Sequence, residues 1–162
     1  MSLIQSNNRW LIAVSFVVVL LLMVFPLPQT WLWSRPELLA LLVIYWVTVL
    51  PQQLSMLLVC GVGGLQDLLE GSVFGQHALA LLVVAYVCLL SYQRIRNYSL
   101  LKQSFFVFII VGLHQLIDNW VHSLNGSGAT SLIFLLPAVM SALIWPGVWL
   151  YLEKLRRTFH IS

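Results

Sequence analysis

The chain has 162 residues, of which 60% are hydrophobic and only 8% are charged. A soluble domain carries about a quarter charged residues, and here the apolar residues form long uncharged runs. This composition excludes a protein with a large aqueous core and indicates an integral membrane protein. The net charge of +3 does not indicate a nucleic-acid-binding protein, because the basic residues lie at the ends of the hydrophobic runs.

Six hydrophobic segments follow one another along the chain, and no soluble domain fits between them. They predict an all-α polytopic membrane protein with six transmembrane helices in a single helical-bundle domain that covers residues 1–162. The first segment has no small-residue cleavage site, which favours an uncleaved anchor over a signal peptide. The predicted spans are residues 10–25, 36–50, 54–69, 78–92, 104–121 and 132–152.

The basic residues predict the orientation of these spans. With the N-terminus inside, seven of the eight Lys and Arg residues fall on the cytoplasmic side, and only Arg35 falls outside. The positive-inside rule therefore favours a topology with both termini in the cytoplasm. The second and third segments are short, and the turn at 51–54 has no charge. Charge alone therefore leaves a re-entrant hairpin open as an alternative to two short spans, which we favour.

The third span ends in the segment 61–75, which places five glycines near two carboxylates. An acid at the centre of a membrane helix costs about 2.5–3.5 kcal/mol on insertion scales, so Asp67 calls for a reason. Counted from the start of its span, Asp67 lies in the outer third. It could bond the backbone of the glycine-rich turn, bind a partner, or take part in proton or solute transfer. On a helix, one small and polar face would comprise Cys60, Gly64, Asp67 and Gly71.

The fifth span carries His114, Asp118 and His122 at successive steps of four, which align on one helix face. His and Asp are ordinary zinc ligands, but three ligands on one helix rarely converge on one ion, so we predict no metal. This face points either into the bundle or into an outer, water-accessible notch. Because Asp67 and Asp118 come out at similar depth, we also expect an intramembrane polar cluster of Asp67, His114 and Asp118. No catalytic motif is present, and we expect neither an enzyme nor a cofactor.

The order of several short motifs along the chain carries a family resemblance. These motifs are Arg35-Pro36, Tyr45-Trp46, Pro51, the segment from Gly64 to Gly75, Ala78-Leu79, Tyr86, the basic loop Arg94–Arg96 and Trp145-Pro146. In this order and spacing the chain resembles the MreD family of rod shape-determining proteins of Gram-negative bacteria. The resemblance covers nearly the whole chain and is strongest from Arg35 to Lys102.

The resemblance implies a fold similar to the substrate-binding S-components of energy-coupling-factor transporters, and a location in the bacterial inner membrane. It implies a non-enzymatic scaffold that binds the bitopic protein MreC and supports lateral peptidoglycan synthesis and rod shape. The further partners would be MreB, RodZ, RodA and its penicillin-binding transpeptidase. The alternative is an S-component-like subunit that binds a small molecule. We expect the partner contacts at Arg35, Pro36, Gly64, Asp67, Gly71 and Gly75.

Overall fold

The computed structural model describes residues 9–24, 35–126 and 131–158. Within these ranges the chain forms six α-helices and one short 3-10 helix, and no strand. The helices are α1 (Arg9–Val24), α3 (Leu38–Val49), α4 (Met56–Glu70), α5 (Gln76–Arg96), α6 (Leu100–Leu124) and α7 (Leu136–Thr158), and the 3-10 helix η1 (Leu132–Leu135) precedes α7.

Each predicted hydrophobic segment overlaps with one of these helices over most of its length, so the all-α prediction is confirmed for the described residues. The boundaries differ most at α7, which ends six residues beyond its predicted span, while α5 and α6 extend up to four residues beyond theirs into polar sequence. Helix α3 begins at Leu38 and not at Pro36, because Glu37 has a non-helical backbone and its amide donates to the Ser141 hydroxyl of α7. The predicted end of the first span, Phe25, lies outside the described residues.

Three of the described helical segments are long and apolar enough to cross a membrane: α5, α6, and η1 continued into α7. Helices α1 and α3 are shorter, with 16 and 12 residues, or about 24 and 18 Å. The chain is thus built as a membrane protein. Six full crossings stay a prediction, as does the choice between two spans and a hairpin for α3 and α4.

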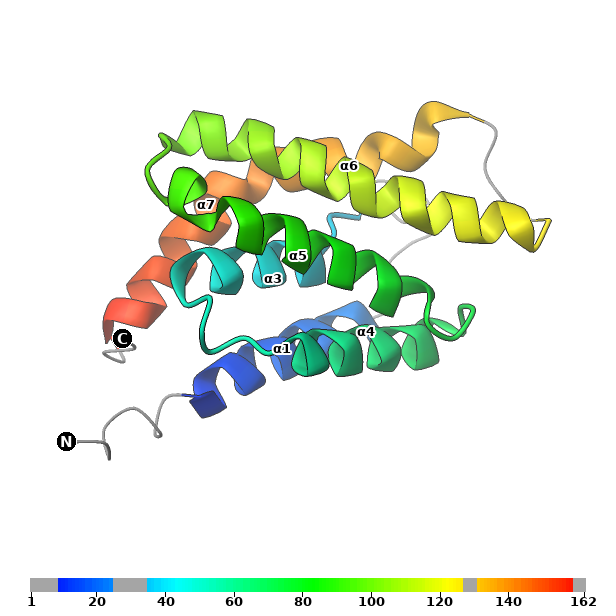
Figure 1. The fold of residues 1–162 in the computed structure, drawn as a ribbon, viewed down its shortest axis with the longest axis horizontal. Helices are drawn as coiled ribbons and strands as arrows, with labels where there is room; N and C mark the ends of the chain where they lie inside the picture. The colour runs from blue at the N-terminus through cyan, green and yellow to red at the C-terminus, as the bar shows by residue number, and fades with distance from the viewer. Residues whose placement is uncertain (1–8, 25–34, 127–130, 159–162) are drawn as a thin grey trace.

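Helix α3 is the core of the bundle. It is apolar along its whole length, and every residue from Leu39 to Thr48 is buried. A helix that is hydrophobic on all sides has no face suited to water and is enclosed by others. Helices α1, α5, α6 and α7 all contact α3 and surround it (Figure 1).

Polar side chains connect α3 to its neighbours inside this apolar core. The Trp46 indole donates to the Ser15 hydroxyl of α1 over 3.1 Å. The Tyr45 hydroxyl donates to Glu153 of α7 over 3.2 Å. Buried polar atoms away from water need such partners, so these bonds fix the rotation of α1 and α7 against α3.

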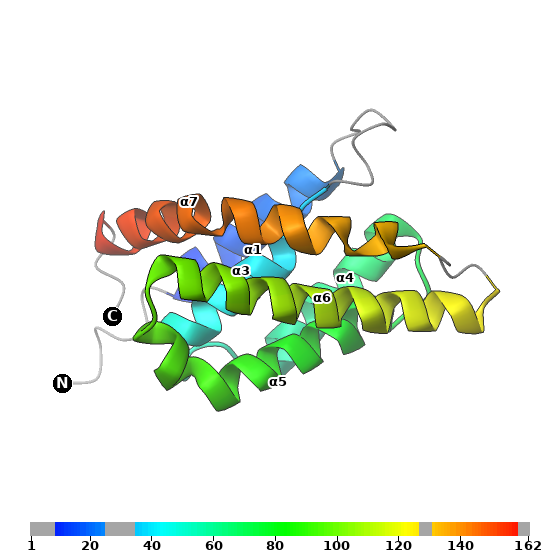
Figure 2. The same ribbon diagram turned by 90° about the horizontal axis from the view of Figure 1, so that it is seen from above.

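Successive helices run in alternating directions, so α1 starts and α7 ends at the same end of the bundle (Figures 1 and 2). We call this the basic end, because it receives the α5–α6 connection and the last turns of α7. Four of the five acidic residues lie at the opposite, acidic end. The acidic end carries Glu37, Asp67, Glu70 and Asp118.

Candidate functional site

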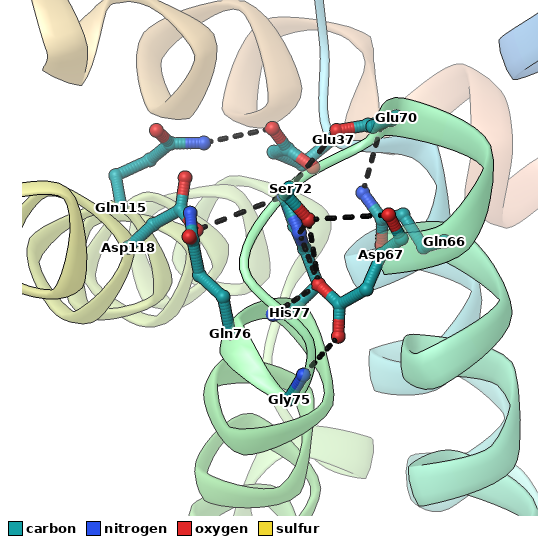
Figure 3. Close-up of polar contacts among 10 residues, drawn as sticks. All are labelled: Glu37, Gln66, Asp67, Glu70, Ser72, Gly75, Gln76, His77, Gln115 and Asp118. Atoms are coloured by element: carbon teal, nitrogen blue, oxygen red, sulfur yellow. Dashed lines mark hydrogen bonds and ion pairs between the residues drawn. The ribbon is translucent and has the colours of Figure 1, made fainter. Parts of the chain in front are cut away.

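A network of polar side chains gathers at the acidic end, where α4, α5 and α6 meet the residue that precedes α3 (Figure 3). Such a concentration of polar groups within helices of a membrane protein is a candidate functional site. We call this network the polar cluster. It comprises Glu37, Gln66, Asp67, Glu70, Ser72, Gly75, Gln76, His77, Gln115 and Asp118.

Asp67 joins the end of α4 to the start of α5. Its side chain is buried, and its Oδ2 accepts from the Gly75 amide over 2.8 Å while its Oδ1 accepts from the His77 amide over 2.9 Å. These amides belong to the first turn of α5, whose N–H groups have no partner within the helix. The Ser72 hydroxyl also donates to Oδ1, over 2.9 Å. Asp67 thus caps α5 across the turn, where the helix dipole favours a negative charge.

The turn between α4 and α5 depends on two glycines with positive φ. Gly71, with φ of 65°, directly follows the end of α4, and Gly75, with φ of 95°, directly precedes α5. Side chains other than glycine rarely adopt this left-handed backbone. Between the two glycines, Phe74 points away from the bundle with 76% of its surface exposed. The turn therefore folds around the Asp67 carboxylate and presents an aromatic ring outward.

His77 lies at the centre of the polar cluster and connects three helices. Its Nδ1 is 2.8 Å from Asp67 Oδ1. On the other side of the ring, Nε2 is 3.4 Å from Glu70 Oε2 and 3.6 Å from Asp118 Oδ1. One imidazole is thus placed among three carboxylates (Figure 3). Asp118 of α6 is held in place by the Gln76 amide group, which donates to it.

Ser72, His77 and Asp67 meet, but they do not form a catalytic triad. A triad requires the Ser on one ring nitrogen of the His and the acid on the other. Here Ser72 Oγ lies 3.3 Å from Nδ1, the same nitrogen that faces Asp67, and its hydroxyl donates to the carboxylate. The arrangement positions helix ends and does not activate a nucleophile.

Two further polar contacts connect the polar cluster to α3 and α7. The Gln115 amide of α6 donates to Glu37 Oε1 over 2.8 Å. The Glu37 backbone amide donates to the Ser141 hydroxyl over 3.0 Å. Glu37 therefore joins the start of the enclosed helix α3 to α6 and α7, and the second Glu37 oxygen is buried without a partner among the described residues.

His114 is the most unusual group near the polar cluster. Its side chain is fully buried, and neither ring nitrogen has a hydrogen-bond partner among the described residues. The ring centroid lies 6.1 Å from that of His77. A buried polar group without a partner costs about 1–3 kcal/mol, so the His114 ring lowers the stability of the fold.

The structure thus places Asp67, His114 and Asp118 near one another, but they contact through His77 and not directly. Sequence reasoning missed His77, because it lies outside the stepwise pattern of polar residues on the fifth span. The available signal was its position directly after the glycine-rich turn, in the first turn of α5. Among the described residues, no group of three or more His, Cys, Asp and Glu residues is arranged to hold a metal ion.

The glycine that allows close helix packing is Gly63 and not Gly64. A Cβ at Gly63 would lie 2.5 Å from the Ala78 Cα, so α4 and α5 touch backbone to backbone there. A Cβ at Gly64 would meet no atom within 4 Å among the described residues. Neighbouring residues of a helix point in directions about 100° apart. Gly63 therefore faces the backbone of α5, whereas Gly64, one residue later, does not. Gly64 and the exposed Cys60 leave an open surface on α4.

Arg35 and Pro36 make their hydrogen bonds away from the turn that Asp67 organises. The Arg35 guanidinium donates to the Leu22 carbonyl near the end of α1 over 3.3 Å. Pro36 lies just before α3, and its carbonyl accepts from the Leu38 amide over 2.9 Å. These two residues therefore connect α1 with the start of α3, and not with the turn that Asp67 organises.

Comparison with known proteins gives a consistent result across the chain. The family model described as rod shape-determining protein MreD matches residues 4–155. A curated relative, the rod shape-determining protein MreD of Haemophilus influenzae (strain ATCC 51907 / DSM 11121 / KW20 / Rd), is 34% identical over 154 residues, which cover 92% of this chain and 93% of that protein. No solved structure matches the chain.

Proposed function

Because the chain belongs to the MreD family of rod shape-determining proteins, we propose that it is a non-enzymatic scaffold of the rod complex that binds MreC. In this proposal it lies in the bacterial inner membrane with both termini in the cytoplasm. It supports lateral peptidoglycan synthesis together with MreB, RodZ, RodA and the transpeptidase partner of RodA. The family match over nearly the whole chain is the observation that carries the proposal.

The chemistry of the polar cluster supports a scaffold over an enzyme. Its polar groups bond helix ends and a turn to one another, and the Ser72 hydroxyl is occupied by Asp67. The connections between α3, α4, α5 and α6 are short. Such a protein offers helix faces and tight turns as its contact surfaces, which suits association with other membrane helices.

We assign the MreC contact to two neighbouring parts of the α4–α5 hairpin. The first is the open face of α4 at Cys60 and Gly64, where small residues allow a second helix to approach closely. The second is the turn from Gly71 to Gly75, where Phe74 is exposed. Asp67 acts indirectly, because its buried carboxylate holds the turn in shape. Arg35 and Pro36 contribute by fixing the start of α3 beside the same end of the bundle.

Co-purification from native membranes tests this proposal. We expect MreC to be recovered with the tagged wild-type protein, and Gly64→Leu or Phe74→Ser to reduce its recovery by about fivefold or more, which corresponds to about 1 kcal/mol. A Cβ at Gly64 would meet no atom of the described chain within 4 Å, and Phe74 is exposed. Ala13→Leu, which adds the same side chain on an exposed part of α1, is the matched control and should retain MreC.

Two results would contradict the proposal. One is full recovery of MreC with both variants, which would remove this surface from the interface. The other is purification with a tightly bound small molecule and no protein partner, which would favour an S-component-like subunit. Depletion of the protein in rod-shaped cells provides a second readout, because loss of a rod-complex scaffold should make the cells round.

A further inference from the structure

A long apolar groove runs along the outside of the bundle between α1 and α7. Its volume is about 670 Å³, and α3 contributes to its floor through Leu38 and Leu42. Both flanking helices pack on α3, but they leave the space between them open. The groove is separate from the polar cluster and shares no lining residue with it.

The lining of this groove is almost free of polar atoms. Ser15 is the one lining residue with an aliphatic hydroxyl, and that hydroxyl is already used. It donates to the Ile12 carbonyl over 2.6 Å and accepts from the Trp46 indole over 3.1 Å. Away from Trp10 and Tyr151 at one mouth, a polar ligand would therefore find no free hydrogen-bonding side chain along the walls, whereas a hydrocarbon chain needs none.

The length and floor of the groove suit a single extended chain. On α1 its lining runs from Trp10 to Leu22, a rise of about 18 Å. One leaflet of the hydrocarbon core is about 15 Å deep, half of about 30 Å. On α7, Gly147 lines the groove, and a Cβ added there would meet no atom within 4 Å. Gly147 thus leaves room that any larger side chain would fill.

Positive charge stands at one mouth of this apolar groove. The lining at the basic end includes Trp10, Tyr151 and Leu155, and aromatic residues of this kind lie at the level of lipid head groups. Lys154, Arg156 and Arg157 lie in the same last turns of α7.

Glu153 offsets only part of this positive charge. One carboxylate oxygen of Glu153 is 2.7 Å from Arg156 and 3.1 Å from Arg157, so two guanidinium groups share a single negative charge. With Lys154 the segment 153–157 keeps a net charge of +2. Charge complementarity at this mouth therefore favours an anionic group, and cytoplasmic leaflets are rich in anionic head groups.

From these observations we propose that the groove binds an anionic phospholipid. One acyl chain lies between α1 and α7 over Gly147, and the head group lies against Lys154, Arg156 and Arg157. In the predicted orientation this lipid belongs to the cytoplasmic leaflet. The bound lipid fills the gap between α1 and α7, which both pack on α3, and so completes the bundle at that side.

Native mass spectrometry of the full-length protein tests the acyl-chain site. The protein is purified from bilayers that contain equal amounts of phosphatidylglycerol and phosphatidylethanolamine. We expect phosphatidylglycerol to be retained by about fivefold or more over phosphatidylethanolamine, the preference that a single Lys or Arg near an anionic surface supplies. Gly147→Leu should abolish this retention. Gly61→Leu, at a helical glycine that also has open space around it, is the matched control and should keep it.

The head-group site is tested separately. Combined Lys154→Gln and Arg157→Gln should bring the two lipids close to parity, while Arg156 still occupies Glu153. Equal retention of the two lipids by the wild-type protein would overturn the proposal. Equal loss from the Gly147 and Gly61 variants would overturn the acyl-chain site, and unchanged selectivity in the Lys154/Arg157 variant would overturn the head-group site.

A photo-cross-linking residue at Val148, which lines the groove, identifies the occupant in cells. An adduct with the mass of a phospholipid supports the proposal. An adduct with the mass of a polypeptide would show that a partner helix occupies the groove instead, and the absence of any adduct would show that nothing stably occupies it. Either of these results would refute lipid binding.

Discussion

The cap that Asp67 provides to α5 leads to a quantitative prediction for Asp67→Ala. The substitution removes the acceptors of the His77 and Gly75 amides. His77 is buried, so its orphaned amide costs about 1–3 kcal/mol. Gly75 is half-buried, and the loss of its bond resembles the loss of a helix cap, at about 1 kcal/mol. We therefore expect Asp67→Ala to lower the free energy of unfolding by about 2–4 kcal/mol.

Asp67→Asn should have about half this effect, because the Asn side chain has one carbonyl oxygen and can accept from only one of the two backbone amides, Gly75 or His77. The side-chain NH2 group of the Asn would then face the N–H of the other backbone amide, and two donors cannot bond to each other. Both effects can be measured by equilibrium unfolding in mixed detergent micelles, with helical circular dichroism as the signal. Glu70→Gln is the matched control: it changes a nearby acid at the exposed rim and should alter stability by no more than about 0.5 kcal/mol.

The reasoning fails if Asp67→Ala unfolds with the same free energy as Glu70→Gln. A second informative pattern separates stability from binding. If Asp67→Asn keeps full stability yet loses MreC, the carboxylate itself contacts the partner, and its buried position in the free protein would have to change on binding. If stability and MreC recovery fall together, Asp67 acts by holding the turn.

Two further predictions concern single positions in the helices. Gly63→Ala should lower the free energy of unfolding by about 1–3 kcal/mol, because its Cβ would overlap the Ala78 backbone. Gly64→Ala should leave the free energy of unfolding unchanged or raise it by up to about 1 kcal/mol through helix propensity. Equal effects of the two substitutions in thermal unfolding would refute the contact assigned to Gly63. His114→Leu should leave stability unchanged or increase it by about 1–3 kcal/mol, since it removes a buried polar group without a partner. A large loss of stability on detergent titration would show that the His114 ring has a partner after all, and a loss of rod-shape rescue without loss of stability would assign it a function.

The pattern of hydrophobic segments was sufficient to predict the helices and most of their boundaries. Helix ends shifted by only a few residues where a backbone contact intervened, as at Glu37, whose amide bonds to Ser141 across 104 positions of sequence. No local pattern contains such a partner. The long helices α5 and α6 continue beyond their apolar runs, because helical hydrogen bonds continue through polar residues once the helix is established.

The polar cluster was only partly predictable. Asp67 stood out because an acid in an apolar run requires a reason, and its bonds to the following turn were one of the expected outcomes. His77 did not stand out, because its role comes from three carboxylates that belong to two other helices. Periodicity gives the direction of a side chain about its own helix axis, but not the neighbour that it meets.

The sequence alone indicated a helical membrane protein, because length, hydropathy and charge are local properties that the bilayer reads directly, and the order of its motifs resembled the MreD family. Only the tertiary structure decided that α3 is the enclosed core, since a helix that is apolar on every side carries no sign of which face meets protein and which meets lipid. The same holds for the close contact at Gly63 and for the groove between α1 and α7, because both depend on how separate helices lie against one another.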